Sequence, residues 1–140
     1  VVHFPVALLI VATLFKLIGL AKPSLAWTKS YSILLLLGVV GAWAAIYTGN
    51  LADGEVSRKL CDPTVLKEHE NLSYVSAWIF SAALVLCFLE KTVANLKFFV
   101  CLLLIAGSGF LTYTGHLGAT LVYQQAAGVY TPDEDCSDFE

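Results

Sequence analysis

The chain has 140 residues, of which 58% are hydrophobic and only 14% charged, and its mean hydropathy is +0.76. These proportions exclude an ordinary soluble domain and indicate a membrane protein. The formal net charge is −3, and the sequence contains no basic patch for nucleic acid, no nucleophile–base set and no phosphate-binding loop. Nothing therefore indicates a nucleic-acid-binding protein, a hydrolase or a transferase.

Four apolar runs follow one another along the chain, at about residues 4–21, 31–49, 72–89 and 98–122. Each is long enough to cross the hydrocarbon as a helix, which takes roughly 20 residues. The first run lacks a basic start and carries His3 and Pro5 at its beginning, so it does not resemble a cleaved signal. The missing initiator Met suggests that a short leader is absent.

The connections between the runs predict the topology. A short segment around residues 21–30 joins the first two runs, and residues 90–95 join the last two, so each pair is expected to form an antiparallel hairpin. We therefore predict an all-α, transmembrane up-down-up-down four-helix bundle over residues 1–125, made of two repeated hairpins. Residues 126–140 are expected to form an acidic tail.

A repeat with a period of 66 residues links the two hairpins. It relates His3 to His69, Asn50 to His116 and Gly41 to Gly107, and it lays Tyr47–Leu51 over Tyr113–Leu117. Parallel repeats of this kind imply a pseudo-twofold axis along the membrane normal. Equivalent helices would then lie diagonally across the bundle.

The distribution of lysines predicts the orientation, because positive residues gather on the cytoplasmic side. One end of the helices carries Lys16, Lys22, Lys29, Lys91 and Lys97. At the other end Arg58, Lys59 and Lys67 are diluted by most of the acidic residues. We expect a bacterial inner-membrane protein whose long loop from Asn50 to Asn71 and C-terminal tail face the periplasm.

The cysteines agree with this orientation. Cys61 and Cys136 fall in the predicted outer segments, where disulfides persist, and we predict a bond between them. Cys87 and Cys101 fall within helices and are interpreted as small packing residues. No CxxCH motif occurs, which excludes covalent c-type haem on this chain.

The three histidines are the main candidates for chemistry, because all are expected at the same outer level of the bundle. Ionisable groups at membrane depth are costly and usually face the bundle interior. Imidazoles on diagonal helices suit the two axial positions of a haem iron. The leading hypothesis is one low-spin b-type haem ligated by His3 and His69. His116 and Asn50 would hydrogen-bond a propionate or an imidazole, and His116 could replace either ligand. Gly49 and Gly115 belong to small-residue stretches that either pack helices or admit a flat cofactor.

Two alternatives remain open. The first is a compact metal site with His3, His69 and His116 as nitrogen ligands and Glu68 or Glu70 as an oxygen ligand. No HxxxH or HxH pair supports it. The second is a structural subunit without a cofactor, whose polar layer packs against larger partners.

The sequence resembles a bacterial membrane-protein family catalogued as domain of unknown function 2231. The resemblance covers most of the chain and rests on these segments: VHFPVALL at residues 2–9, Thr48-Gly49 with Asp53, His69, GHLG at 115–118, Val122-Tyr123 and Gly128-Val129. It implies four membrane helices and no established activity. The general plan is also similar to di-haem cytochromes of the b561 type, but no histidine lies on the predicted cytoplasmic side.

A single outer haem cannot complete an electron path across the bilayer. The sequence therefore favours a cytochrome b-like electron-transfer subunit of a respiratory or photosynthetic complex over an independent enzyme. Its expected partners are other subunits of that complex, a periplasmic c-type cytochrome or quinol, and the lipid membrane.

Overall fold

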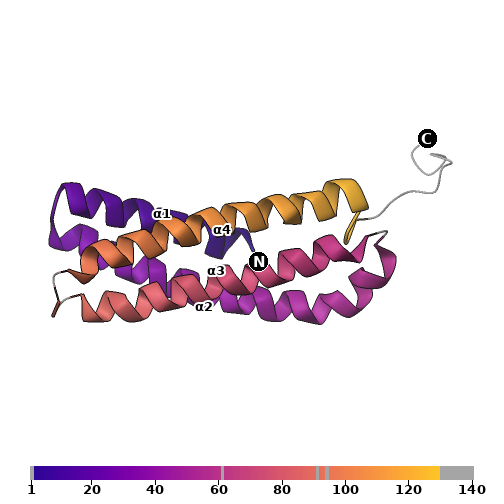
Figure 1. The fold of residues 1–140 in the computed structure, drawn as a ribbon, viewed down its shortest axis with the longest axis horizontal. Helices are drawn as coiled ribbons and strands as arrows, with labels where there is room; N and C mark the ends of the chain where they lie inside the picture. The colour runs from indigo at the N-terminus through magenta and orange to yellow at the C-terminus, as the bar shows by residue number, and fades with distance from the viewer. Residues whose placement is uncertain (1, 61, 91, 94, 130–140) are drawn as a thin grey trace.

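A computed structural model of the chain contains four long helices, and it describes residues 2–60, 62–90, 92–93 and 95–129. α1 spans His3–Ala21, α2 Leu25–Val56, α3 Pro63–Leu89 and α4 Leu96–Gln125, and a short 3-10 helix, η1, spans Ser57–Lys59. Successive helices run in opposite directions (Figure 1). The predicted all-α four-helix bundle of two hairpins is confirmed.

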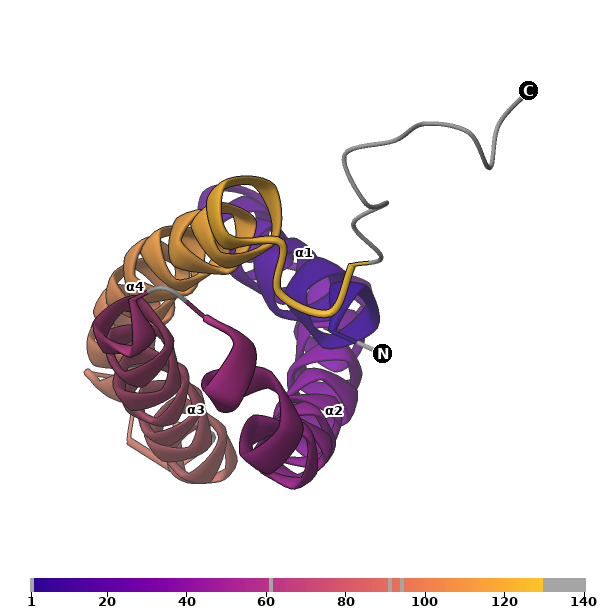
Figure 2. The same cartoon turned by 90° about the vertical axis from the view of Figure 1, so that its right-hand side faces the viewer.

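The helices form a ring in chain order. α1 packs on α2, α2 on α3, α3 on α4 and α4 on α1, as the view along the bundle shows (Figure 2). α1 therefore lies diagonally opposite α3, and α2 opposite α4, as predicted. All four helices are long and apolar enough to cross a membrane.

Two of the helices, α2 and α3, extend well beyond the predicted apolar runs. α2 continues past Gly49 to Val56, and α3 begins at Pro63 rather than near Leu72. Asp62 starts α3, because its Oδ1 accepts the Thr64 backbone N–H at 2.9 Å and Pro63 suits the first helical position. The expected loop from Asn50 to Asn71 is thus mostly helix, because helix capping rather than hydropathy sets its ends.

One end of the bundle, which we call the turn end, contains the α1–α2 and α3–α4 connections. A buried polar network lies near it, formed by Lys16, Tyr31, Cys87 and Glu90. Lys16 Nζ pairs with Glu90 Oε2 and donates to the Tyr31 hydroxyl at 3.2 Å. That hydroxyl donates to Glu90 Oε1 and accepts from Cys87 Sγ at 3.1 Å. This Lys16–Glu90 cluster connects α1 and α2 of the first hairpin to α3 of the second.

The remaining core is apolar and tight. A Cβ placed on Gly38 of α2 would lie 2.7 Å from Leu9 Cδ2, so the absence of a side chain lets α1 and α2 approach closely. The buried core of the described residues includes Leu9, Leu35, Phe80, Val100 and Leu104.

Part of the predicted tail and the predicted disulfide lie outside the described residues. Cys61 and Cys136 both lie outside the described residues, so their disulfide stays a prediction, and of the tail only residues 126–129 are described. Cys87 and Cys101 are buried free thiols, which agrees with a packing role.

Candidate functional site

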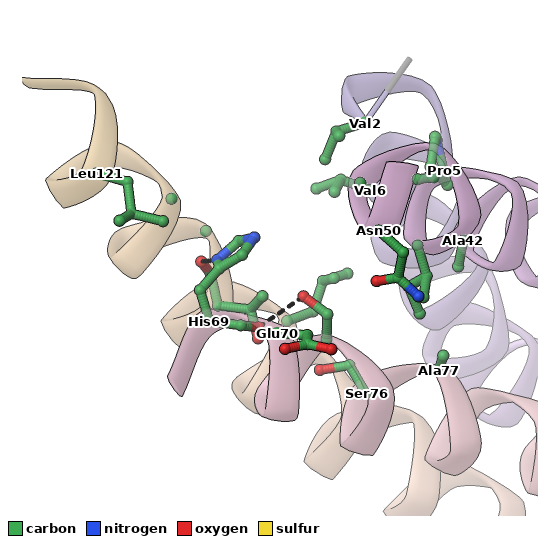
Figure 3. Close-up of a pocket in the computed structure, with 18 of the residues that line it drawn as sticks. Val2, Pro5, Val6, Ala42, Asn50, His69, Glu70, Ser76, Ala77 and Leu121 are labelled. Carbon is green, nitrogen blue, oxygen red and sulfur yellow. Dashed lines mark hydrogen bonds between the residues drawn. The ribbon is translucent and has the colours of Figure 1, made fainter. Parts of the chain in front are cut away.

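The opposite end of the bundle, which we call the His69 end, contains a cavity of about 490 Å³. All four helices and Ala127 line it (Figure 3). Ala127 reaches it because Ala126, in the left-handed region at φ 52°, ends α4 and turns the chain back. A cavity of this volume is large enough for a small organic ligand or cofactor.

The His69 cavity changes from apolar to polar along the bundle axis. Its inner part is lined by side chains such as Leu9, Ala42, Ala77 and Phe80. The polar side chains that line it are Asn50, Asp53, His69, Glu70, Ser73, Ser76 and Thr114. Most of these lie toward the end of α2 and the start of α3, so an occupant would meet an apolar floor and a polar mouth.

The charge pattern of α2 places this gradient relative to the membrane. Residues 31–49 carry no charge, and 19 residues span about 28 Å, close to the hydrocarbon thickness. Asn50, just beyond them, donates from Nδ2 to the Tyr74 hydroxyl of α3 at 2.7 Å. His69 lies five residues further out on α3, roughly 7 Å at 1.5 Å per residue. The polar mouth is therefore near the headgroup level and the floor lies within the hydrocarbon.

His69 is held in a defined orientation. Its Nδ1 lies 2.9 Å from the Thr114 backbone oxygen. A carbonyl can only accept, so Nδ1 carries the hydrogen and Nε2 of the neutral ring presents a lone pair. Figure 3 shows this second nitrogen directed away from α4 toward the space between the helices. Gly118 makes room for the ring, since a Cβ there would lie 3.2 Å from His69 Cε1.

Most hydroxyl groups of the cavity already donate their hydrogens to the backbone. Ser73 donates to the His69 oxygen at 2.7 Å, and Thr114 donates to the Phe110 oxygen at 2.8 Å. Ser76 differs, because its residue is only 3% exposed and its Oγ has no hydrogen-bond partner within the described residues. A buried hydroxyl without a partner in the protein is unusual, which distinguishes Ser76 from the other hydroxyl groups of the cavity.

The structure separates the residues predicted to form one layer. Pro5 of α1 packs against Gly41 of α2, so His3, two residues before Pro5, lies about level with Trp43. Trp43 Nε1 donates to Ser81 Oγ of α3 at 3.0 Å, which places Ser81 at the same level. Ser81 is twelve residues along α3 from His69, roughly 18 Å of helix. Figure 1 shows that α1 begins near the middle of the long axis of the bundle. The expectation of a single level for all three histidines is therefore wrong for His3, and an iron beside His69 would not reach it.

The repeat explains this error. A shift of 66 residues predicts that Gly107 packs on Asn71, as Gly41 packs on Pro5. Instead, a Cβ on Gly107 would meet Ile79 and Phe80 at 3.1 Å. The two hairpins thus pack in different registers, and equivalent sequence positions lie at different depths.

The other predicted residues divide between the cavity wall and the surface. Gly49, Asn50, Gly115 and Glu70 line the cavity. His116 is exposed and stacks on Tyr113 with ring centroids 6.4 Å apart, while Glu68 is exposed and accepts from the Tyr113 hydroxyl at 3.3 Å.

The three-histidine metal site is not formed. In the described part of the chain, no three His, Cys, Asp or Glu side chains come close enough to hold a metal ion. There are two physical reasons. The two hairpins pack in different registers, so His3 at the start of α1 lies near the middle of the bundle rather than at the His69 end. His116 is exposed and does not line the cavity.

Two features were missed by reasoning from the sequence. Ser76 lies seven residues after His69, on the same face of α3, and that spacing was the available signal. The Lys16–Glu90 cluster was not predicted, because Lys16 was grouped with the other lysines at one end of the helices and Glu90 was placed in the connection. The position of Lys16 within an otherwise apolar run was the signal for burial.

The fold and the distribution of polar groups define a multi-pass membrane protein with four apolar helices. A family model described as "Predicted membrane protein (DUF2231)" matches residues 1–131, so the chain belongs to that family. No curated protein and no solved structure matches the chain. These comparisons lend no support to the likeness in plan to di-haem cytochromes.

Proposed function

We propose that this protein is a membrane subunit that holds one amphipathic redox molecule in the His69 cavity, with His69 Nε2 as its polar anchor. The observation that carries the proposal is the His69 ring itself. Its Nδ1 is bonded to the Thr114 oxygen at 2.9 Å, which turns the other nitrogen toward a largely apolar cavity. Ligand sites in helix bundles are built in this way, from side chains on facing helices.

A b-type haem is the occupant suggested by the sequence, and His69 could supply one axial ligand. Histidines that bind metals usually donate their other ring N–H to a carbonyl or carboxylate, as His69 does to Thr114. The other proposed ligand, His3, is separated from His69 by about twelve residues of helix rise, so the haem hypothesis now rests on His69 alone. Neither His3 nor His116 lines the cavity.

A hydroquinone is the second candidate, favoured by the acceptor groups around the mouth. In either case the cellular role that we propose is electron transfer at the periplasmic side of a bacterial inner membrane. The partners would be other subunits of a respiratory or photosynthetic complex and a c-type cytochrome.

The test uses two histidines of the same hairpin. The full chain and its His69→Ala and His116→Ala variants are purified in mild detergent from cells with adequate haem supply. A reduced-minus-oxidised spectrum detects haem, and mass spectrometry of an organic extract detects quinones. We expect an occupant in the wild type and in His116→Ala, and its loss in His69→Ala.

An empty wild-type cavity would overturn the proposal. So would an occupant retained equally in His69→Ala. Thermal unfolding of each variant provides the control for folding.

A further inference from the structure

We infer that the His69 cavity selects a hydroquinone, that is, an aromatic ring with two hydroxyl groups on an apolar tail, over the corresponding quinone. This inference rests on the proposed function, because it names the occupant of the same cavity. It comes from the direction of each hydrogen bond around the mouth.

The mouth offers acceptors rather than donors. His69 Nε2 presents a lone pair because Nδ1 holds the hydrogen. Asn50 donates one of its two Nδ2 hydrogens to the Tyr74 hydroxyl, and its carbonyl oxygen is directed toward the cavity (Figure 3). The carboxyl groups of Glu70 and Asp53 also line the cavity. Lys67 pairs with Oε2 of Glu70, so Oε1 is the Glu70 oxygen that can accept a hydrogen bond from a ligand. A molecule with hydroxyl donors satisfies such a set, whereas quinone carbonyls, which only accept, do not.

The charges of the wall disfavour anionic occupants. Asp53 and Glu70 are the only charged residues among the described lining residues, and no Lys or Arg lines the cavity. Haem propionates and phospholipid phosphates would face these carboxylates, and the Lys67 ammonium, which lies outside the lining, is already paired with Glu70. A neutral hydroquinone avoids this repulsion.

Ser76 supplies the complementary contact deeper in the cavity. Its hydroxyl lacks a partner in the described residues, and because its Oγ is covered, a rotation of the side chain would bring its hydrogen to an acceptor in the cavity. Ser76 and His69 are seven residues apart on one helix face, roughly 10 Å along α3. A hydroquinone ring with oxygens in para positions, together with one hydrogen bond at each oxygen, spans a similar length. The first hydroxyl would donate to His69 Nε2, and the second oxygen would accept from Ser76.

The apolar floor accounts for the tail. Leu9, Ala77 and Phe80 lie on the membrane side of the polar mouth. An occupant anchored at His69 would therefore extend its apolar part into the hydrocarbon level, as a molecule dissolved in the membrane does.

The experiment measures binding of a decyl-substituted ubiquinol analogue and of its oxidised form to the full chain in lipid nanodiscs, under argon. We expect the reduced form to bind about 10-fold more tightly or better, a difference of roughly 1.4 kcal/mol. Glu70→Gln should reduce this preference, because an amide can turn its donor toward a quinone carbonyl. Ser76→Ala should weaken binding, and His116→Ala should change neither affinity nor preference.

Each outcome separates the two proposals. Equal binding of the two oxidation states, or a preference unchanged in Glu70→Gln, overturns the inference. Tight binding of haem through His69 with no binding of the hydroquinone also overturns it and leaves the proposed function standing. Hydroquinone binding that is unchanged in a folded His69→Ala variant overturns both.

Discussion

The Lys16–Glu90 cluster leads to a quantitative prediction about stability. Both side chains are 6% exposed, and each contacts the Tyr31 hydroxyl as well as its partner. Removing one member of a buried ion pair typically costs about 3–5 kcal/mol, because the other charge is left without compensation. Glu90→Gln leaves the Lys16 ammonium with the Tyr31 hydroxyl and ring, whose centroid lies 4.5 Å away. We expect this variant to lose about 3–5 kcal/mol of unfolding free energy.

The reverse substitution should cost less. Lys16→Met leaves the Glu90 carboxyl bonded to the Tyr31 hydroxyl, so a loss of about 1–3 kcal/mol is expected. The double variant Lys16→Met/Glu90→Gln contains no buried charge at this position. Since a buried ion pair can often be replaced without loss of stability, we expect the double variant to regain most of the unfolding free energy that Glu90→Gln loses.

The assay is equilibrium unfolding of the detergent-solubilised protein with increasing dodecyl sulfate, followed by far-ultraviolet circular dichroism. Lys29→Met is the matched control, because Lys29 is exposed at the same end of the bundle, and it should change stability by less than about 0.5 kcal/mol. Additive losses in the double variant, or a Glu90→Gln variant as stable as Lys29→Met, would refute the reasoning.

Two further predictions concern the helices. Gly38→Ala should destabilise the bundle by about 1–3 kcal/mol, because its Cβ would lie 2.7 Å from Leu9 Cδ2 and 3.3 Å from the Leu9 backbone nitrogen. Gly49→Ala, with nothing within 4 Å of its Cβ, should be neutral or slightly stabilising in the same unfolding assay. The bonds from the Thr64 hydroxyl and backbone N–H hold the pKa of Asp62 below its ordinary value of 3.8. Asp62 therefore contributes stability above about pH 4 that is lost as the pH falls through its lowered pKa. The difference in unfolding midpoint between wild type and Asp62→Ala should accordingly shrink between pH 6 and pH 3, and a constant difference would contradict this.

The sequence predicted the helices well because membrane spans carry a strong signal. Long apolar runs separated by short connections leave few topologies open, and the two hairpins and their diagonal arrangement follow from them. The ends of the helices were predicted poorly. The last turns of α2 and the first turns of α3 are polar, and only the Asp62 cap and Pro63 mark where α3 begins.

The depth of each residue could not be predicted from the repeat. Helix register depends on which small residue meets which side chain, and Gly41 meets Pro5 whereas Gly107 meets Phe80. A difference of two turns in packing moves a histidine from the headgroup level to the middle of the bundle. His69 was identified as a candidate, but its supposed partner His3 was not placed correctly for this reason.

The two polar clusters of the bundle differ in a way that bears on function. In the Lys16–Glu90 cluster the polar groups satisfy one another across three helices, so the cluster needs no further molecule. In the His69 cavity the acceptors outnumber the donors, Ser76 has no partner in the described residues, and about 490 Å³ lies between the walls. Unsatisfied buried polar groups are costly, so a molecule that bonded to these groups would gain from doing so. The cluster at the turn end therefore connects the two hairpins, and the His69 end is where we propose that a ligand binds.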